Sequence, residues 1–273
     1  MKYSVLMAIY QNDDADFLRR ALTSIYEEQT RKPDEIIVVF DGPLTSSLYA
    51  VMDDFAKGKE GIVHYHREEF NKGLGEALRI GSAHCTGDYI FRMDSDDVSH
   101  PERFEKQAAY VEAHPEIDVL GTDIAEFYEN FNDEKLRVRV CPAQHSDIVA
   151  MGRRRDPMNH VTACIKREAL TRCGGYESLF LLEDYFLWLK MITAGCVLAN
   201  INESLVYVRI GNGFHSKRGA KVRIKGWRVL QDYMLEHKLI TKSEARKNMF
   251  YIRAFTYCPT WIRKLLYDKI LRK

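Results

Sequence analysis

The stretch YIFRMDSDDV, residues 89–98, joins two segments of opposite character. Its first three residues suit a buried β-strand, whereas residues 94–97 place three carboxylates within four positions. Like charges repel, and a carboxylate without a partner is costly to desolvate. A divalent cation would remove this conflict, because hard oxygen ligands suit Mg²⁺ or Mn²⁺. The stretch therefore predicts a strand that ends at a metal site.

Helix capping is the alternative explanation for these acidic residues. Asp96, Asp97 or Ser99 could cap a helix beginning at Pro101, a residue type typical of the first helical turn. One aspartate explains a cap, but three do not, so we favour the metal.

Two of the carboxylates are the predicted metal ligands. In an extended segment Asp94 and Asp96 point to the same side, so both can face one ion. His215, within GNGFHSKRG, is a candidate third ligand or phosphate contact. An ordinary surface histidine is at least as good a reading of that position.

Strand-like and helix-like segments alternate along the first 130 residues. The predicted strands are 3–10, 35–40, 62–66, 89–93 and 118–128, and the predicted helices are 17–26, 49–55, 75–85 and 101–114. This alternation predicts an α/β fold with a mostly parallel sheet covered on both faces. Ligands bind beyond the carboxyl ends of such strands, where residues 10–12, Asp41 and residues 94–97 carry polar groups.

The second half of the chain is less regular. Short strands are predicted at 136–140 and 160–165, a helix at 183–195, and an extended segment at 197–210. From Gly219 onward the pattern is helical to the end, with a break near Pro259.

Composition excludes several classes of protein. The chain has 273 residues, 46% hydrophobic and 29% charged, which is typical of a folded globular protein and not of a disordered one. It contains no run of eighteen apolar residues, so no transmembrane helix is expected, and its first residues lack the features of a signal peptide. The six cysteines are scattered without a CxxC pair, which predicts reduced thiols and no zinc site.

Charge is distributed unevenly between the two ends. From Phe214 onward there are sixteen Lys or Arg and four Asp or Glu, a balance of +12, which leaves −11 for the first 213 residues. A basic end on an acidic body suggests contact with an anionic membrane or a nucleic acid. A solvated helical face is the plain alternative.

Two further motifs carry possible chemistry. Residues 71–75, NKGLG, open a helix, where backbone N–H groups and Lys72 favour an anion, although the GK[ST] ending of a P-loop is missing. Glu183 and Asp184 begin another helix, and acidic residues are common at that position because they interact favourably with the helix dipole. The functional alternative is that one of them is a general base that accepts a proton from a sugar hydroxyl.

Five blocks of the sequence resemble the family-two glycosyltransferases, in the same order and at suitable distances. They are SVLMAIYQND, PDEIIVVFDG, NKGLGEALRIG, GDYIFRMDSDDVSHPERFEKQ and GGYESLFLLEDYFLWLKM. The chain is most similar to bacterial enzymes of O-antigen and exopolysaccharide assembly, strongly through about residue 210 and weakly beyond it. It lacks the QxxRW motif of processive synthases, which favours transfer of a single sugar.

The resemblance implies a GT-A fold with a Rossmann-like sheet, a nucleotide-sugar donor and inversion at the sugar.

 At the positions that match the family's motifs, Ala8 and Tyr10 would line the nucleotide base. Asp41 would form a hydrogen bond with that base, and Lys72 would lie near the nucleotide. Asp94, Ser95 and Asp96 would form the DxD-like element that touches the ribose and the metal, Mn²⁺ or Mg²⁺, and Asp184 would be the catalytic base.

The resemblance also implies a domain organisation. A GT-A domain would span 1–213, with a nucleotide-sugar-binding half at 1–100 and an acceptor-binding half at 101–213. A basic helical extension would follow at 214–273. Transfer of a hexose, galactose or glucose, from a UDP-sugar to an undecaprenyl-diphosphate-linked glycan is the expected reaction.

The end of the chain fits that acceptor. Residues 255–273, FTYCPTWIRKLLYDKILRK, mix aromatic and aliphatic residues with cations, which suits a helix at an anionic membrane surface. Such an enzyme would be cytoplasmic and peripheral on the inner face of the membrane. Packing of this helix on the domain is the alternative.

Two other functions remain open from sequence. A nucleotidyltransferase would share the architecture and the metal, but its basic glycine-rich loop should follow the first strand, where YQNDDAD stands instead. A nucleic-acid-binding protein could use the basic end, but no nucleic-acid motif is present and no such partner is expected.

Overall fold

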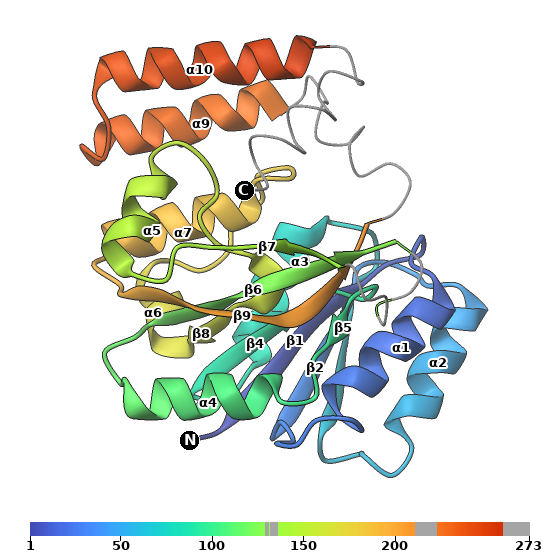
Figure 1. Ribbon diagram of the computed structural model, residues 1–273. Coiled ribbons are helices and arrows are strands. Elements are labelled where there is room, and N and C mark those ends of the chain that lie inside the picture. The colour runs from blue at the N-terminus through green and yellow to red at the C-terminus, as the bar shows by residue number, and fades with distance from the viewer. Residues whose placement is uncertain (129–130, 132–135, 211–222, 259–273) are drawn as a thin grey trace.

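The computed structural model describes residues 1–128, 131, 136–210 and 223–258 (Figure 1). The strands are β1 Tyr3–Ile9, β2 Glu35–Phe40, β3 Val63–Arg67, β4 Tyr89–Met93, β5 Val98–Ser99, β6 Val119–Phe127, β7 Arg137–Arg139, β8 Cys164–Lys166 and β9 Leu198–Arg209. The helices are α1 Ala15–Ile25, α2 Ser46–Ala56, α3 Leu74–His84, α4 Arg103–Ala113, α5 His145–Gly152, α6 Arg167–Arg172, α7 Glu183–Thr193, α9 Arg223–Glu236 and α10 Lys242–Tyr257, with a 3₁₀ helix at His160–Thr162.

The strands form one sheet in the order β3-β2-β1-β4-β8-β6-β9-β5, and β7 pairs with β6. The first four strands are mutually parallel, and β6 is parallel to β9. The short strand β8 runs antiparallel to both β4 and β6 and so joins the two parallel groups. The predicted α/β fold is confirmed, and the parallel strands bring the ends of β1, β2 and β4 to one edge of the sheet.

Alternating side chains give the sheet two buried faces. In β1, Val5 and Met7 belong to one apolar cluster, which α1, α2 and α4 cover, while Leu6 belongs to the other, which α3, α6 and α7 cover. Successive strand residues point to opposite faces, so strands buried on both sides are apolar throughout. This explains why the N-terminal strands were recognisable as continuous apolar runs.

Helix α7 is itself enclosed between two layers. Leu187 and Trp188 face the sheet, whereas Leu182, Tyr185 and Phe186 lie in a third apolar cluster with residues of α9 and α10. In Figure 1, α9 and α10 lie side by side at the end of the molecule beyond α7, with α10 outermost. The packing therefore connects the outermost helix to the helix that begins at Glu183.

Three predicted elements differ in the structure. The helix predicted at 101–114 begins at Arg103, because residues 101–102 form a turn. The strand predicted at 160–165 is a 3₁₀ helix at His160–Thr162 followed by β8, and the predicted continuous C-terminal helix is interrupted between α9 and α10 at residues 237–241. Pro259, where the break was expected, lies outside the described residues.

No helix among the described residues is both long enough and apolar enough to cross a membrane. The six cysteines all lie among the described residues and form no disulfide.

Candidate active site

Three carboxylates gather beyond the end of β4. One oxygen from each of Asp94, Asp96 and Asp97 lies within 4.8 Å of the other two. The backbone N–H of Arg209 donates to Asp97 at 2.8 Å, and α4 has no side-chain cap. Helix capping therefore does not explain the cluster. The sequence placed Asp94 and Asp96 together, but Asp97 was not among the predicted ligands.

The cluster resists full ionisation. Desolvation, followed by the charges of Asp94 and Asp13, raises the pKa of Asp96 to about 6. Burial, followed by Asp96 and Asp94, raises the pKa of Asp97 well above its ordinary value. Oxygen-only ligands of this kind fit Mg²⁺ or Mn²⁺, whose charge would offset the repulsion.

A buried arginine lies beside the cluster. Arg92 is 2% exposed and its guanidinium forms an ion pair with Asp94. Its positive charge also acts to lower the pKa of Glu183, against the larger effects that raise it. Together with the larger effect of desolvation, the same charge lowers the pKa of His160. Arg92 thus connects the metal candidates with the start of α7. Its signal in the sequence is a lone charged residue inside the otherwise apolar strand 89–93.

Asp41 organises the loop that precedes α3. Its two carboxylate oxygens accept hydrogen bonds from the backbone N–H groups of Lys72, at 2.6 Å, and Gly73, at 3.0 Å. Gly42 has a φ of +89°, and a Cβ there would lie 2.8 Å from the nitrogen of Asn71, so the close approach requires glycine. The predicted hydrogen bond from Asp41 to a nucleotide base stays a prediction, since these contacts show a role in holding the loop.

The other predicted donor-site residues lie at the same edge of the sheet. Ala8 is partly buried near the end of β1, and Tyr10 follows that strand. Desolvation, followed by Asp13 and with a smaller effect of Asp96, raises the pKa of Tyr10, which relates its phenol to the carboxylate cluster. Ser95 is buried, at 8% exposure.

Lys72 is the cation of this group. Its ammonium forms an ion pair with Glu68, whose other oxygen contacts His66 at 2.9 Å. The pair anchors Lys72 beside the loop that Asp41 holds.

The start of α7 packs against the start of α3. A Cβ on Gly75 would lie 3.0 Å from the Cα of Ser178 and 3.3 Å from the Cβ of Glu183. The close packing brings the predicted donor loop to the predicted base, although the two are far apart in sequence. Leu181, just before α7, has a φ of 57°, a left-handed conformation that is uncommon for leucine and is found at functional turns.

Glu183 and Asp184 have different surroundings. Glu183 is buried, and its side chain accepts a hydrogen bond from the backbone N–H of Leu182 at 3.0 Å. Desolvation, followed by the charge of Asp184, raises the pKa of Glu183 to about 7. Asp184 is less enclosed, and its carboxylate accepts a hydrogen bond from the N–H of Tyr185 at 2.7 Å.

Asp156 is a further acidic residue that the sequence did not reveal. Its carboxyl group lies close enough to Asp184 for the two charges to act on each other, and it accepts a hydrogen bond from the backbone N–H of Met158 at 3.2 Å. Burial, followed by the charge of Asp184, raises the pKa of Asp156 well above its ordinary value. Two neighbouring carboxyl groups repel each other when both are charged, so Asp156 is a group that can position Asp184.

This contact predicts a graded response to substitution. Asp156→Ala removes the carboxyl group beside Asp184 and is expected to lower kcat roughly 10- to 100-fold while the KM for the donor stays unchanged. Asp156→Asn keeps a donor toward Asp184 and is expected to restore most of the turnover. Steady-state kinetics on both variants provide the check, and an Asn variant as impaired as the Ala variant would contradict it.

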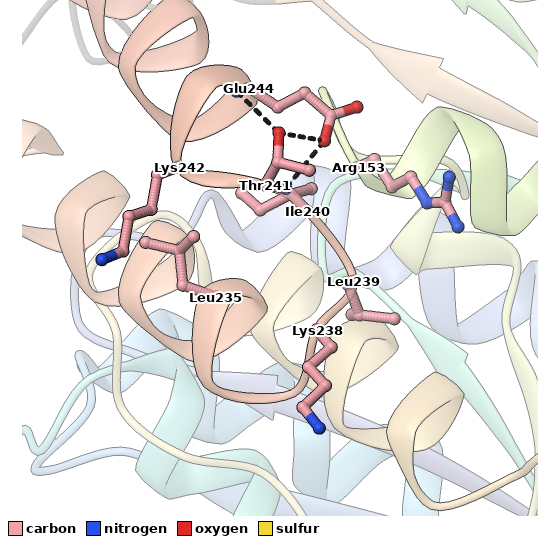
Figure 2. Close-up of a pocket in the computed structure, with 8 residues that line it drawn as sticks. All are labelled: Arg153, Leu235, Lys238, Leu239, Ile240, Thr241, Lys242 and Glu244. Atoms are coloured by element: carbon pink, nitrogen blue, oxygen red, sulfur yellow. Dashed lines mark hydrogen bonds between the residues drawn. The ribbon is translucent and has the colours of Figure 1, made fainter.

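His215, the third predicted ligand, lies outside the described residues. A pocket of about 480 Å³ lies at the turn between α9 and α10, apart from the carboxylate cluster (Figure 2). None of the predicted site residues lines it.

Comparisons with known proteins identify the family of the chain. A family model described as glycosyl transferase family 2 matches residues 4–180. The chain is 34% identical to the UDP-Gal:alpha-D-GlcNAc-diphosphoundecaprenol beta-1,3-galactosyltransferase of Escherichia coli, covering 100% of this chain and 97% of the relative. It is 33% identical to the amylovoran biosynthesis glycosyltransferase AmsE of Erwinia amylovora, covering 98% of each.

A solved structure has the same fold. GalNAc-T7 with UDP, GalNAc and Mn²⁺ superposes with a TM-score of 0.70 at 18% identity, covering 98% of this chain and 54% of that one. The predicted GT-A fold is confirmed by this likeness.

Proposed function

Because the chain belongs to glycosyltransferase family 2, we propose that it transfers one hexose, galactose or glucose, from a UDP-sugar to a lipid-diphosphate-linked saccharide. The observation that carries this proposal is the 34% identity, over nearly the full length of both chains, to an enzyme named for UDP-Gal and a GlcNAc-diphosphoundecaprenol acceptor. The AmsE relative supports a place in the assembly of cell-surface polysaccharide of the exopolysaccharide or O-antigen type. Membership of the family disfavours the nucleotidyltransferase and nucleic-acid-binding alternatives.

The donor side of the proposed mechanism uses the ends of β1, β2 and β4. Ala8 and Tyr10 line the nucleotide, Asp41 contributes to its base-binding side, and Lys72 supplies a positive charge near the diphosphate. Asp94, Asp96 and Asp97 are the groups that would hold Mn²⁺ or Mg²⁺. When bound, the cation stabilises negative charge on the departing nucleoside diphosphate.

The acceptor side uses the start of α7. Asp184 accepts the proton of the acceptor hydroxyl as that oxygen forms a bond to the anomeric carbon. The bond from this carbon to the diphosphate oxygen breaks in the same displacement, so the configuration inverts. Arg92 holds Asp94 in place through their ion pair, and Asp156 positions Asp184 from beside it.

A donor panel tests this function. Radiolabelled UDP-galactose, UDP-glucose, UDP-N-acetylglucosamine and GDP-mannose are each offered with a synthetic GlcNAc-diphosphate-lipid acceptor and Mn²⁺. We expect transfer from a UDP-hexose and a product of inverted anomeric configuration by NMR. Transfer from GDP-mannose alone, or a product with retained configuration, would refute the proposed donor or the proposed mechanism.

The proposed location is the inner face of the cytoplasmic membrane, as a peripheral protein, because a lipid-linked acceptor would be held at that surface. The predicted membrane segment, 255–273, lies largely outside the described residues.

A further inference from the structure

The outer face of α10 has an unusual composition. Arg246, Phe250 and Arg253 follow one another at helical spacing, and Lys247 and Tyr251 lie on the adjacent stripe. All five side chains are exposed, with Phe250 at 68% and Tyr251 at 58%. From Ala245 to the end of α10 the sequence contains no acidic residue. We call these five residues the α10 face.

Several exposed cations in the first half of the chain are paired with acidic residues, whereas those of the α10 face are not. Arg19 and Lys57 both pair with Asp54, and Arg79 pairs with Glu76. Among the described residues, Arg246, Lys247 and Arg253 form no ion pair or hydrogen bond. Their charge is therefore available to an anionic partner.

The two aromatic residues form a continuous apolar contact surface. The rings of Phe250 and Tyr251 lie 5.8 Å apart, edge to face. Large exposed aromatic side chains flanked by cations are typical of helices that lie in the membrane interface. A nucleic acid would also attract the cations, but adjoining edge-to-face rings that project from one helix suit insertion between lipid headgroups.

The helix is firmly held from its other side. Thr241 and Glu244 form a capping box at its start, visible in Figure 2, and Ala245 packs in the apolar cluster with α9 and α7. Asn248 donates to the backbone oxygen of Arg153 at 2.9 Å and to Gln231 on α9 at 3.0 Å. The inner side of α10 therefore packs against the rest of the protein, whereas the α10 face is exposed and can contact an external surface.

We propose that the α10 face docks the enzyme on an anionic phospholipid surface. The proposal rests on the proposed function, because a lipid-linked acceptor is presented at such a surface. Trp227 of α9 contacts Tyr185 of α7, with ring centroids 5.5 Å apart, so the docked helix is packed through α9 onto the helix whose first turn carries Asp184.

Vesicle co-sedimentation tests the docking. The full chain is expected to bind vesicles of phosphatidylcholine and phosphatidylglycerol and to dissociate from them in high salt. It is not expected to bind vesicles of phosphatidylcholine alone. Arg246→Ser/Lys247→Ser/Arg253→Ser is expected to weaken binding roughly 100-fold, since each cation near an anionic surface contributes about a fivefold factor. Phe250→Ser/Tyr251→Ser is expected to weaken it about tenfold.

The matched control removes three exposed cations that lie away from α10, on α1, at the end of α2 and on α3. Arg19→Ser/Lys57→Ser/Arg79→Ser carries the same change in net charge and is expected to bind vesicles as the unmodified chain does. Equal losses in the control and the α10 variant would overturn the proposal, because they would show an effect of net charge alone. Tighter binding of plain duplex DNA than of vesicles through the same three residues would overturn it too.

The failure of docking and of the proposed function can be told apart. Transfer to a short-chain soluble acceptor analogue should be unchanged in both α10 variants. A chain that binds vesicles but transfers no sugar would refute the proposed function and leave the α10 face as a membrane contact.

Discussion

Replacement of Asp96 by asparagine is expected to lower sugar transfer by about 1000-fold or more. A bound divalent cation supplies several kcal/mol of stabilisation to the departing diphosphate, and each 1.4 kcal/mol corresponds to tenfold in rate. Asp96 is one of three carboxylates whose oxygens lie within 4.8 Å of one another, so its substitution would remove one of the three proposed metal ligands. Asp94→Asn should have a similar effect, and Asp53→Asn, on the exposed surface of α2, is the matched control.

The same substitution is expected to raise stability in the absence of metal. The pKa of Asp96 is raised in the folded protein, to about 6, so the fold binds this proton more tightly than the unfolded chain does. The free energy of unfolding therefore increases as the pH falls through about 6, where the carboxylate is protonated in the folded protein. It is lower above that pH, where the carboxylate is charged. Asp96→Asn removes that charge, so the variant should have a higher Tm than the unmodified chain when both are measured at a pH above neutral.

Metal dependence separates these two effects. Mn²⁺ should raise the Tm of the unmodified chain and leave that of Asp96→Asn nearly unchanged, as thermal denaturation with and without the ion would show. Full turnover in excess EDTA would contradict the assignment of the cluster as a metal site.

Replacement of Asp184 by asparagine is expected to lower turnover about 10²- to 10⁴-fold, the usual contribution of a general base. The asparagine keeps the shape of the side chain and removes its basicity. Binding of UDP, measured by calorimetry with Mn²⁺, should be nearly unchanged, because the proposed donor site lies at the ends of β1, β2 and β4.

Glu183→Gln is the matched comparison. Glu183 is buried and its pKa is raised to about 7, so at neutral pH it is only partly ionised. Its substitution should therefore cost less than that of Asp184. Normal turnover in Asp184→Asn with an inactive Glu183→Gln would exchange the two roles, and activity in both would place the base elsewhere.

The periodicity of the sequence determined most elements of the first half of the molecule. The strand predicted at 89–93 has those bounds in the structure, and α1, α2 and α3 begin and end within a few residues of their predictions. These elements were predictable because strand and helix periods are local properties of the chain. The gathering of Asp94 and Asp96 was predictable for the same reason, since both lie in one short segment.

Tertiary structure alone decided which distant residues meet. Asp156 reaches Asp184 because the loop after α5 packs against α7, where the hydroxyl of Tyr185 donates to the backbone oxygen of Gly152 at 2.6 Å. Arg92 was visible only as a charge within an apolar strand, and its pairing with Asp94 depends on which face of the sheet it occupies. Such contacts join segments that no local pattern relates, because packing and burial set both the partners and the pKa values of the groups that meet.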